Sequence, residues 1–322
     1  MDSNATPTLG LDISKTKVHC ALLQNGKFRS KAIANSDAGF EALGAWLAKQ
    51  KVKKVHACCE ATGIYWEAIA LWLSDHGHTL SVVNPARIAA YARSRMTRAK
   101  TDPVDARLIA DFCAREAPPL WTPPPAEERL LLALLRRLHD LEKVRQAEAN
   151  RLAVAHPSVR PNIEQLLGFL DQQIAQLKKT IKDHIDRNDN LRGRRDLLDS
   201  VPGLGEATIP WLIAYLGDGQ RFERSKQAVA FAGMAPRPHQ SGTLSRKTHI
   251  AKSGHADLRH VLYMPAVAAY RRCAAYAPFV QRLKAAGKPG KVIIVALMRK
   301  LLTIAHAVLK SGQPFNPELH QA

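Results

Sequence analysis

The order of short apolar strands and helices in the first 116 residues constrains the fold of this chain more than any other feature. Asn25-Gly26 separates two strand-like segments, and this dipeptide is a strong signal for a two-residue hairpin turn. Apolar periodicity predicts strands over 8–14, 17–24, 27–33, 54–60 and 79–83, and helices over 37–50, 65–77, 85–93 and 103–116.

This β-β-β-α-β-α-β-α order matches a ribonuclease-H-like fold. The proline-rich segment 117–129 follows, and it predicts a domain boundary. We therefore expect a first domain over residues 1–120.

Two long helices are expected after this break. Apolar residues recur at alternating steps of three and four along 131–141, and again along 163–181. Such narrow apolar stripes suit an antiparallel hairpin, the coiled-coil arm of a dimer, or packing inside one domain core. We expect a coiled-coil region over 126–190 and leave these arrangements open.

The segment 197–217 places Pro202-Gly203-Leu204-Gly205 between two apolar helices. It resembles a helix-hairpin-helix, whose glycine-rich turn presents backbone N–H groups to a phosphate. A plain turn between helices would look similar. Gly203 and Gly205 are therefore candidate nucleic-acid contacts.

Charge is distributed unevenly along the chain. The formal net charge is +19. Residues 1–125 contribute +5, residues 126–218 are neutral, and residues 219–322 contribute +14 from 17 Lys or Arg and 3 Asp or Glu. Such an excess of one sign predicts contact with a polyanion, most simply nucleic acid.

Composition narrows the class of protein. The chain is 46% hydrophobic and 23% charged, as expected of a soluble globular protein. No uninterrupted apolar run reaches the roughly 18 residues of a membrane span, and the N-terminus lacks a basic-then-apolar signal. The five cysteines form no CxxC pair. We expect a cytoplasmic protein with free thiols and no membrane association.

Two acidic residues lie in apolar strands. Asp12 is flanked by Leu11 and Ile13, and Glu60 ends the strand "VHACCE". An ionised carboxylate costs several kcal/mol if it is buried without a partner. One such residue could simply face solvent, but two at the ends of adjacent strands suggest a site.

Asp102 and Asp105 allow two interpretations. Asp102 could cap the helix that begins near Pro103, with Asp105 as the acid of a capping box. Alternatively, the two carboxylates share one helix face and join Asp12 and Glu60. Four converging carboxylates need cations, and their hard oxygen donors suit Mg²⁺ in phosphodiester chemistry.

The segments "GLDISK", "CCEATG" and "KTDPVDA" resemble the D, E, D and D segments of the DEDD insertion-sequence transposases. The segments that follow also appear in that family's order, so the resemblance covers roughly residues 8 to 317. It implies an α/β plus α architecture: a RuvC-like N-terminal domain, a long helical coiled-coil middle, and a mostly helical basic transposase domain over 191–322.

The resemblance also assigns a role to Ser241, one of three serines in the basic segment 239–255. It matches the family's catalytic serine, which would form a covalent phosphoserine link to DNA. For an arbitrary serine, a polar loop that contacts phosphate would be the simpler interpretation. The other candidate nucleic-acid contacts are Arg98, Lys100, Arg246, Lys247, Lys252 and Arg259.

Sequence positions suggest how Ser241 is activated. Its nearest acids along the chain are Glu223 and Asp257, so a local serine triad is not expected. We expect instead that Mg²⁺ held by the four acids assists the serine. His239, His249, His255 and His260 could suggest zinc, although phosphate contact or packing suits their irregular spacing better.

The resemblance implies a transposase that cleaves, exchanges and rejoins donor and target DNA. It further implies a structured guide RNA (bridge RNA) and a homo-oligomer, dimeric and then tetrameric in the synaptic complex. The first alternative is a RuvC-like metal-dependent nuclease in which Ser241 is a bystander. The second is a non-catalytic nucleic-acid-binding protein.

Overall fold

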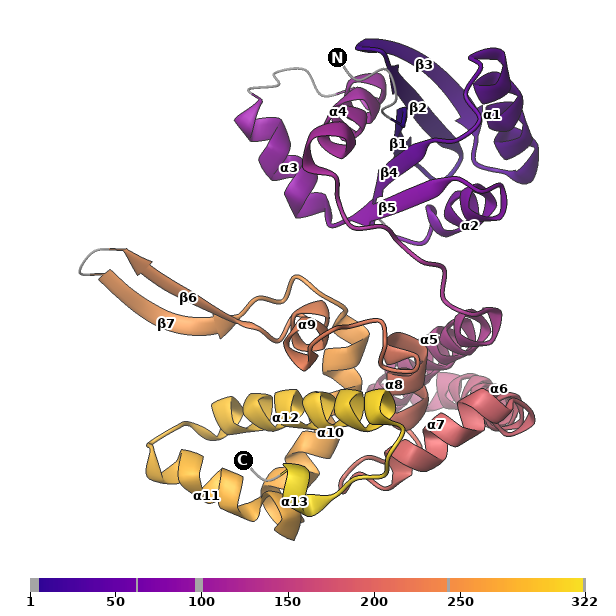
Figure 1. Cartoon of the computed structure of the whole chain (residues 1–322). Coiled ribbons are helices and arrows are strands. Elements are labelled where there is room, and N and C mark those ends of the chain that lie inside the picture. The colour runs from indigo at the N-terminus through magenta and orange to yellow at the C-terminus, as the bar shows by residue number, and fades with distance from the viewer. Residues whose placement is uncertain (1–5, 62, 96–100, 242–243, 321–322) are drawn as a thin grey trace. The chain divides into compact units, whose positions relative to one another are not determined.

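A computed structural model describes residues 6–61, 63–95, 101–241 and 244–320, and the side chains of 238–248 and 319–320 lie outside the description. The chain divides into two compact units, 1–123 and 124–322 (Figure 1). In the first unit the elements are β1 Thr8–Ile13, β2 Lys17–Gln24, β3 Lys27–Ala34, α1 Asp37–Lys49, β4 His56–Glu60, α2 Glu67–Asp75, β5 Thr79–Val83, α3 Pro85–Ser94 and α4 Asp102–Glu116.

The sheet of the first unit has the order β3-β2-β1-β4-β5. β1, β2 and β3 pair antiparallel, whereas β1, β4 and β5 pair parallel. The turn between β2 and β3 places Asn25 at φ 51° and Gly26 at φ 74°, the left-handed conformations that a tight hairpin requires. The predicted order of strands and helices in this region is confirmed.

Helices cover both faces of this sheet (Figure 1). On one face, Leu9, Leu11 and Cys59 pack with buried residues of α1 and α2. On the other face, Cys58 packs with Ile109 and Cys113 of α4. Neighbouring residues of one strand point to opposite faces, so each buried strand supplies both layers.

The second unit is mostly helical. Its elements are α5 Ala126–Val154, η1 Pro157–Val159, α6 Arg160–Arg187, α7 Asp189–Asp199, α8 Ile209–Leu216, α9 Ser225–Phe231, β6 Pro236–Ser241, β7 Leu244–Ile250, α10 Ala256–Arg272, η2 Ala274–Tyr276, α11 Ala277–Ala285, α12 Gly290–Ser311 and α13 Pro317–His320. The mixed α/β sheet in the N-terminal part and the mostly helical C-terminal part therefore agree with the expected fold class.

α5 and α6 form an antiparallel hairpin within the chain. Arg145 pairs with Asp171 and Lys178 pairs with Glu142, pairings that require opposite helix directions. The outer part of the hairpin has a small apolar seam, and the part near α7 and α8 joins the main core of the unit. The structure thus combines two of the three arrangements that the sequence left open.

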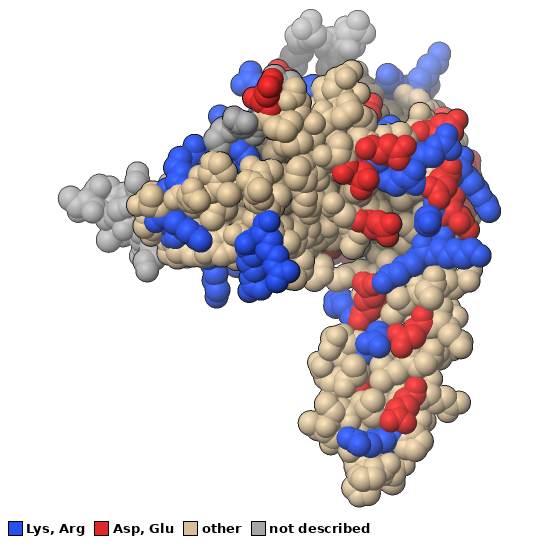
Figure 2. Space-filling view, turned by 90° about the horizontal axis from the view of Figure 1, so that it is seen from below, with Lys and Arg blue, Asp and Glu red and all other residues tan. Residues whose placement is uncertain are grey.

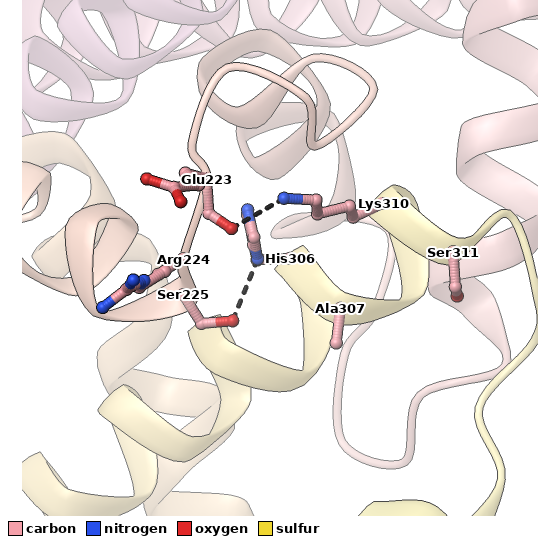
Figure 3. Close-up of a pocket in the computed structure, with 7 residues that line it drawn as sticks. All are labelled: Glu223, Arg224, Ser225, His306, Ala307, Lys310 and Ser311. Carbon is pink, nitrogen blue, oxygen red and sulfur yellow. Dashed lines mark hydrogen bonds between the residues drawn. The ribbon is translucent and has the colours of Figure 1, made fainter.

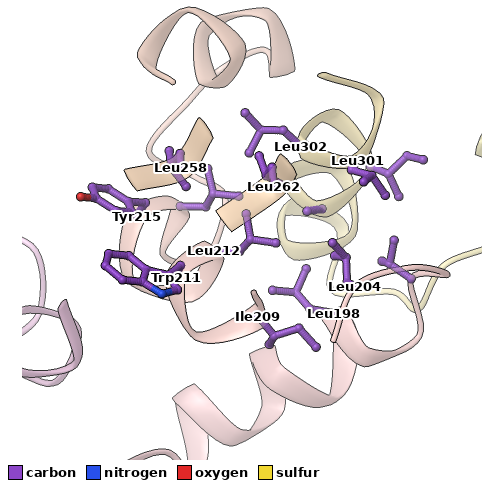
Figure 4. Packing of buried hydrophobic residues seen from close by; sticks show 14 of the residues in the cluster. Leu198, Leu204, Ile209, Trp211, Leu212, Tyr215, Leu258, Leu262, Leu301 and Leu302 are labelled. Carbon is purple, nitrogen blue, oxygen red and sulfur yellow. The ribbon is translucent and has the colours of Figure 1, made fainter. Parts of the chain in front are cut away.

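The core of the second unit surrounds α8, whose residues are all buried (Figure 4). Leu212 is fully buried among side chains of α7, α10 and α12, including Leu198, Leu262 and Leu302. α12 is apolar and long enough to cross a membrane, yet 56% of its most apolar window is buried inside the unit. Arg299 and Lys300 interrupt its apolar run, and its burial is that of a core helix.

Candidate active site

Asp12 and Glu60 lie at the same end of two adjacent parallel strands. The pairing of β1 with β4 sets Leu11 opposite Cys59, and each acid is the next residue along its strand. Both are half-buried. The register therefore brings these two carboxylates to neighbouring positions at the carboxyl end of the sheet.

Both acids are on the face that α4 covers. Gly10 contacts α4 so closely that a Cβ there would lie 2.0 Å from the Ala106 carbonyl oxygen. Asp12 is two residues further along β1 and so faces the same way. Glu60 is likewise two residues beyond Cys58, which packs against α4.

α4 runs antiparallel to β1. Thr8 Oγ1 donates to the Ala110 carbonyl at 3.2 Å, whereas Gly10 contacts both Ala110 and Ala106. Moving along β1 from Thr8 to Gly10 therefore moves the contact toward the start of α4. Asp12, two residues further along β1, lies near the first turn of the helix. Asp102 and Asp105 belong to that turn. The four predicted acids thus share one end of one layer.

His19 is a member of this group that sequence reasoning missed. It pairs with Asp12 across β1 and β2, and its Nε2 lies 3.3 Å from Asp102 Oδ2. Cross-strand partners point to the same face, so His19 links the strand to the helix. The available signal was a polar residue between Val18 and Cys20 in an otherwise apolar strand.

The capping interpretation of Asp102 was wrong in detail. Thr101 is the residue before α4, and its carbonyl accepts from Asp105 N at 2.9 Å. Asp102 is the first helical residue, where its carboxylate reaches His19. An acid in the first turn still suits the positive end of the helix dipole.

The chemistry of this donor set fits a hard cation. All four acids offer carboxylate oxygens, the ligands that Mg²⁺ prefers. As they stand, no three His, Cys, Asp or Glu side chains in the described part of the chain form a group that could hold a metal ion. Asp12, Glu60 and Asp105 each make interactions within the protein.

Ser241 ends the first strand of a hairpin in the second unit. β6 and β7 pair antiparallel, with Ser241 opposite Leu244 and Gln240 opposite Ser245. The backbone of Ser241 is described, whereas its side chain and those of Arg246 and Lys247 are not. Arg98 and Lys100 lie outside the described residues altogether.

The base of this hairpin is closely packed. Arg259 Nη1 donates to the carbonyls of Ala232 and Gly254 at 2.9 and 3.0 Å. A Cβ at Gly254 would lie 2.0 Å from the Phe231 carbonyl oxygen. Arg259 therefore holds the segments on either side of the hairpin together, a structural role that its sequence position did not reveal.

Two other predicted contacts have exposed positions. Lys252 N donates to the Gly233 carbonyl at 2.9 Å, and the Lys252 side chain is exposed. In the turn before α8, Gly203 and Gly205 are exposed while Leu204 is buried between them. A Cβ on Gly205 would meet nothing within 4 Å, so space for a ligand exists there.

His255 behaves differently from a phosphate-binding cation. Its ring packs 4.2 Å from the Phe231 ring, centroid to centroid. Burial, and then the nearby charges of Arg221 and Arg136, lower the pKa of His255 to about 4. His255 is therefore neutral near pH 7 and serves in packing.

Comparison with known proteins identifies the family of this chain. A family model described as "Transposase" matches residues 9–156, and one described as "Transposase IS116/IS110/IS902 family" matches residues 195–281. The pilin gene-inverting proteins of Moraxella bovis and Moraxella lacunata are each 36% identical over 317 residues, covering 97% of this chain and 98% of theirs. The transposase for insertion sequence element IS1328 of Yersinia enterocolitica is 24% identical, covering 77% of this chain and 82% of its own. The chain therefore belongs to the IS116/IS110/IS902 family of transposases.

Proposed function

We propose that this transposase cuts, exchanges and rejoins donor and target DNA through a covalent phosphoserine link at Ser241. The similarity to gene-inverting proteins over nearly the whole chain supports this proposal most directly. Inverting a gene in place requires both of its ends to be cut and rejoined. A link between enzyme and DNA keeps the energy of each broken phosphodiester bond for the rejoining step.

The chemical step balances without an added reactant. The Ser241 Oγ forms a bond to phosphorus, the phosphorus–oxygen bond of the DNA strand breaks, and the proton of the serine passes to the leaving oxygen. Reversal with a new strand end restores the serine. The phosphate would be attracted by Lys252 and by two residues of β7, Arg246 and Lys247.

We also propose that the first unit is RuvC-like and holds Mg²⁺ with Asp12, Glu60, Asp102 and Asp105. Support comes from the shared face, the common end of the sheet and the uniform oxygen donors. Bound Mg²⁺ would stabilise negative charge on phosphate oxygens. His19 would position Asp102 through the contact between their side chains.

The partners follow from the same proposal. Donor and target DNA would be recognised with a structured guide RNA, by a homo-oligomer that is a dimer and then a tetramer in the synaptic complex. The basic face of the second unit supports a polyanionic partner. Figure 2 shows mainly Lys and Arg on the left part of the broad lobe of the displayed face, whereas the right part of that lobe and the projecting arm carry both signs.

Adduct formation tests the proposal. Protein, Mg²⁺, guide RNA and labelled DNA are incubated, and the covalent protein–DNA product is mapped by mass spectrometry. We expect the adduct on Ser241, its loss in Ser241→Ala, and its retention in the matched control Ser245→Ala. Asp102→Asn and metal removal should each slow its formation by at least 100-fold, because charge stabilisation of this kind contributes about that much.

Two results would contradict this scheme. Hydrolytic cleavage that continues at full rate in Ser241→Ala would favour the RuvC-like nuclease, in which water is the nucleophile. An adduct that forms at full rate without metal would refute the role of the four acids.

A further inference from the structure

A pocket of about 390 Å³ lies in the second unit, between the segment before α9 and the C-terminal half of α12 (Figure 3). Ser225 begins α9, whereas His306, Lys310 and Ser311 belong to α12. None of these residues takes part in the proposed reaction. The pocket therefore needs an explanation of its own.

Hydrogen bonds fix the histidine in this pocket. The His306 ring, 1% exposed, places Nε2 3.2 Å from the Phe222 carbonyl oxygen and Nδ1 3.0 Å from Ser225 Oγ. A carbonyl can only accept, so Nε2 carries a proton and donates to the Phe222 carbonyl. Nδ1 shares a hydrogen bond with the Ser225 hydroxyl. His306 thus ties both ends of segment 222–225 to α12.

Lys310 completes this attachment. Its Nζ donates to the Phe222 carbonyl at 3.2 Å and to the Glu223 carbonyl at 2.7 Å. An ammonium group has three donors, so one remains for a ligand. The wall of the pocket is therefore preorganised, with the Lys310 charge held at a fixed place.

Arg224 supplies a second positive charge at this pocket. Its side chain is exposed, and in the described part of the chain its guanidinium makes no ion pair within 4.0 Å. The one acidic lining residue is Glu223, whose carboxylate points away from Ser225 and His306 in Figure 3. Ser225 shares its hydrogen bond with His306, and Ser311 donates to the Val308 carbonyl. The Arg224 guanidinium points away from His306 and Lys310 in Figure 3. An anion would therefore be held by Lys310, and the exposed Arg224 side chain would turn toward it to add the second contact.

The surroundings select the kind of anion. α12 contains Lys291, Arg299, Lys300 and Lys310 and no Asp or Glu. The whole region 219–322 carries 17 basic and 3 acidic residues. A field of this extent attracts a polyanion rather than an isolated small anion.

We propose that this pocket binds one backbone phosphate of the nucleic acid on which the transposase acts, through Lys310 and Arg224. The inference rests on the proposed function but is distinct from the chemistry at Ser241. DNA and RNA both carry the backbone phosphodiesters that this pocket would recognise. Binding of DNA and binding of RNA are therefore measured separately.

Salt dependence of binding tests the proposal. Affinity for a DNA duplex and for the structured RNA is measured by fluorescence anisotropy across salt concentrations. Each lost phosphate contact should reduce the slope of log Kobs against log salt by about 1. We expect a reduction of about 1 in Arg224→Gln/Lys310→Gln, which removes both cations from the one phosphate, and a smaller reduction in Arg224→Gln, with the nucleic acid whose phosphate occupies the pocket. The matched control is Arg160→Gln, an exposed arginine at the start of α6, and it should keep the wild-type slope.

A local measurement guards against indirect effects. The ring nitrogen signals of His306 in NMR spectra should shift when a short oligonucleotide is added to the wild type, and should not shift in the double variant. Equal unfolding midpoints would establish that Arg224→Gln remains folded. Unchanged slopes in both arms would overturn the inference, and a Ser241 adduct in that same preparation would leave the proposed function intact.

Discussion

The close contact between Gly10 and α4 predicts a large effect of Gly10→Ala. The new Cβ would lie 2.0 Å from the Ala106 carbonyl oxygen and 2.4 Å from Ala110 N. Ordinary contact begins near 3.4 Å, so the helix backbone would have to retreat by about 1.4 Å. Backbone atoms cannot rotate away as the end of a flexible side chain can.

We expect Gly10→Ala to lower the free energy of unfolding of the first unit by about 3 kcal/mol, the upper part of the range for overpacked cores. The same retreat would carry Asp102 and Asp105 away from Asp12. On the proposed function, in which these acids hold Mg²⁺, affinity for Mg²⁺ should fall as well in the folded fraction of the protein.

Urea unfolding followed by tryptophan fluorescence measures the first effect. Four of the five tryptophans belong to the first unit, Trp46, Trp66, Trp72 and Trp121, so the signal reports mainly on that unit. Gly168→Ala is the matched control, because it lies in α6 with nothing within 4 Å of its Cβ. Because α6 belongs to the second unit, this control should leave the unfolding transition of the first unit unchanged. A Gly10→Ala protein with wild-type stability and Mg²⁺ affinity would refute the packing of α4 on β1.

Two further predictions concern the second unit. Arg194→Met should destabilise it by about 3 kcal/mol in urea unfolding, because Glu128 is buried and would lose its ion-pair partner; wild-type stability would show that the pair is dispensable. The pKa of His255, lowered to about 4, lies below the ordinary value of 6.5, so the unfolded chain takes up this proton first as pH falls. Stability should therefore decline from pH 6.5 to 4 more steeply in the wild type than in His255→Phe, by at most about 1.4 kcal/mol per pH unit; parallel curves for the two proteins would contradict this.

The fold of the first unit could be predicted because its signals are local. Asn25-Gly26 specifies a turn by its backbone preferences, and the alternation along each strand specifies two buried faces. The arrangement of α5 and α6 could not be chosen in advance. A narrow apolar stripe shows that a helix has a partner but not which helix it is; within this chain, the apolar seam and the cross-helix ion pairs identify that partner.

The sequence could predict those members of the candidate site whose residue type is unusual for its position. Asp12 and Glu60 were conspicuous because carboxylates are unfavourable in buried strands. His19 was not, since its significance comes from the register that sets it opposite Asp12. For Arg259, the sequence could suggest phosphate contact, which stays a prediction, but it could not show that Nη1 donates to two backbone carbonyls.

The contrast between the four acids of the first unit and the basic last hundred residues bears on the order of events in the proposed reaction. The first unit gathers four carboxylates at one end of a sheet, where they would repel a phosphate. The last hundred residues, with a net charge of +14, attract phosphate without discrimination of sequence. On the proposed function, the basic unit would therefore bind nucleic acid first. Productive contact with the acids would then require cations, so binding in the absence of Mg²⁺ should be retained while chemistry is lost. This ordering explains how one chain can combine a local group of four acids with a strongly basic C-terminal region.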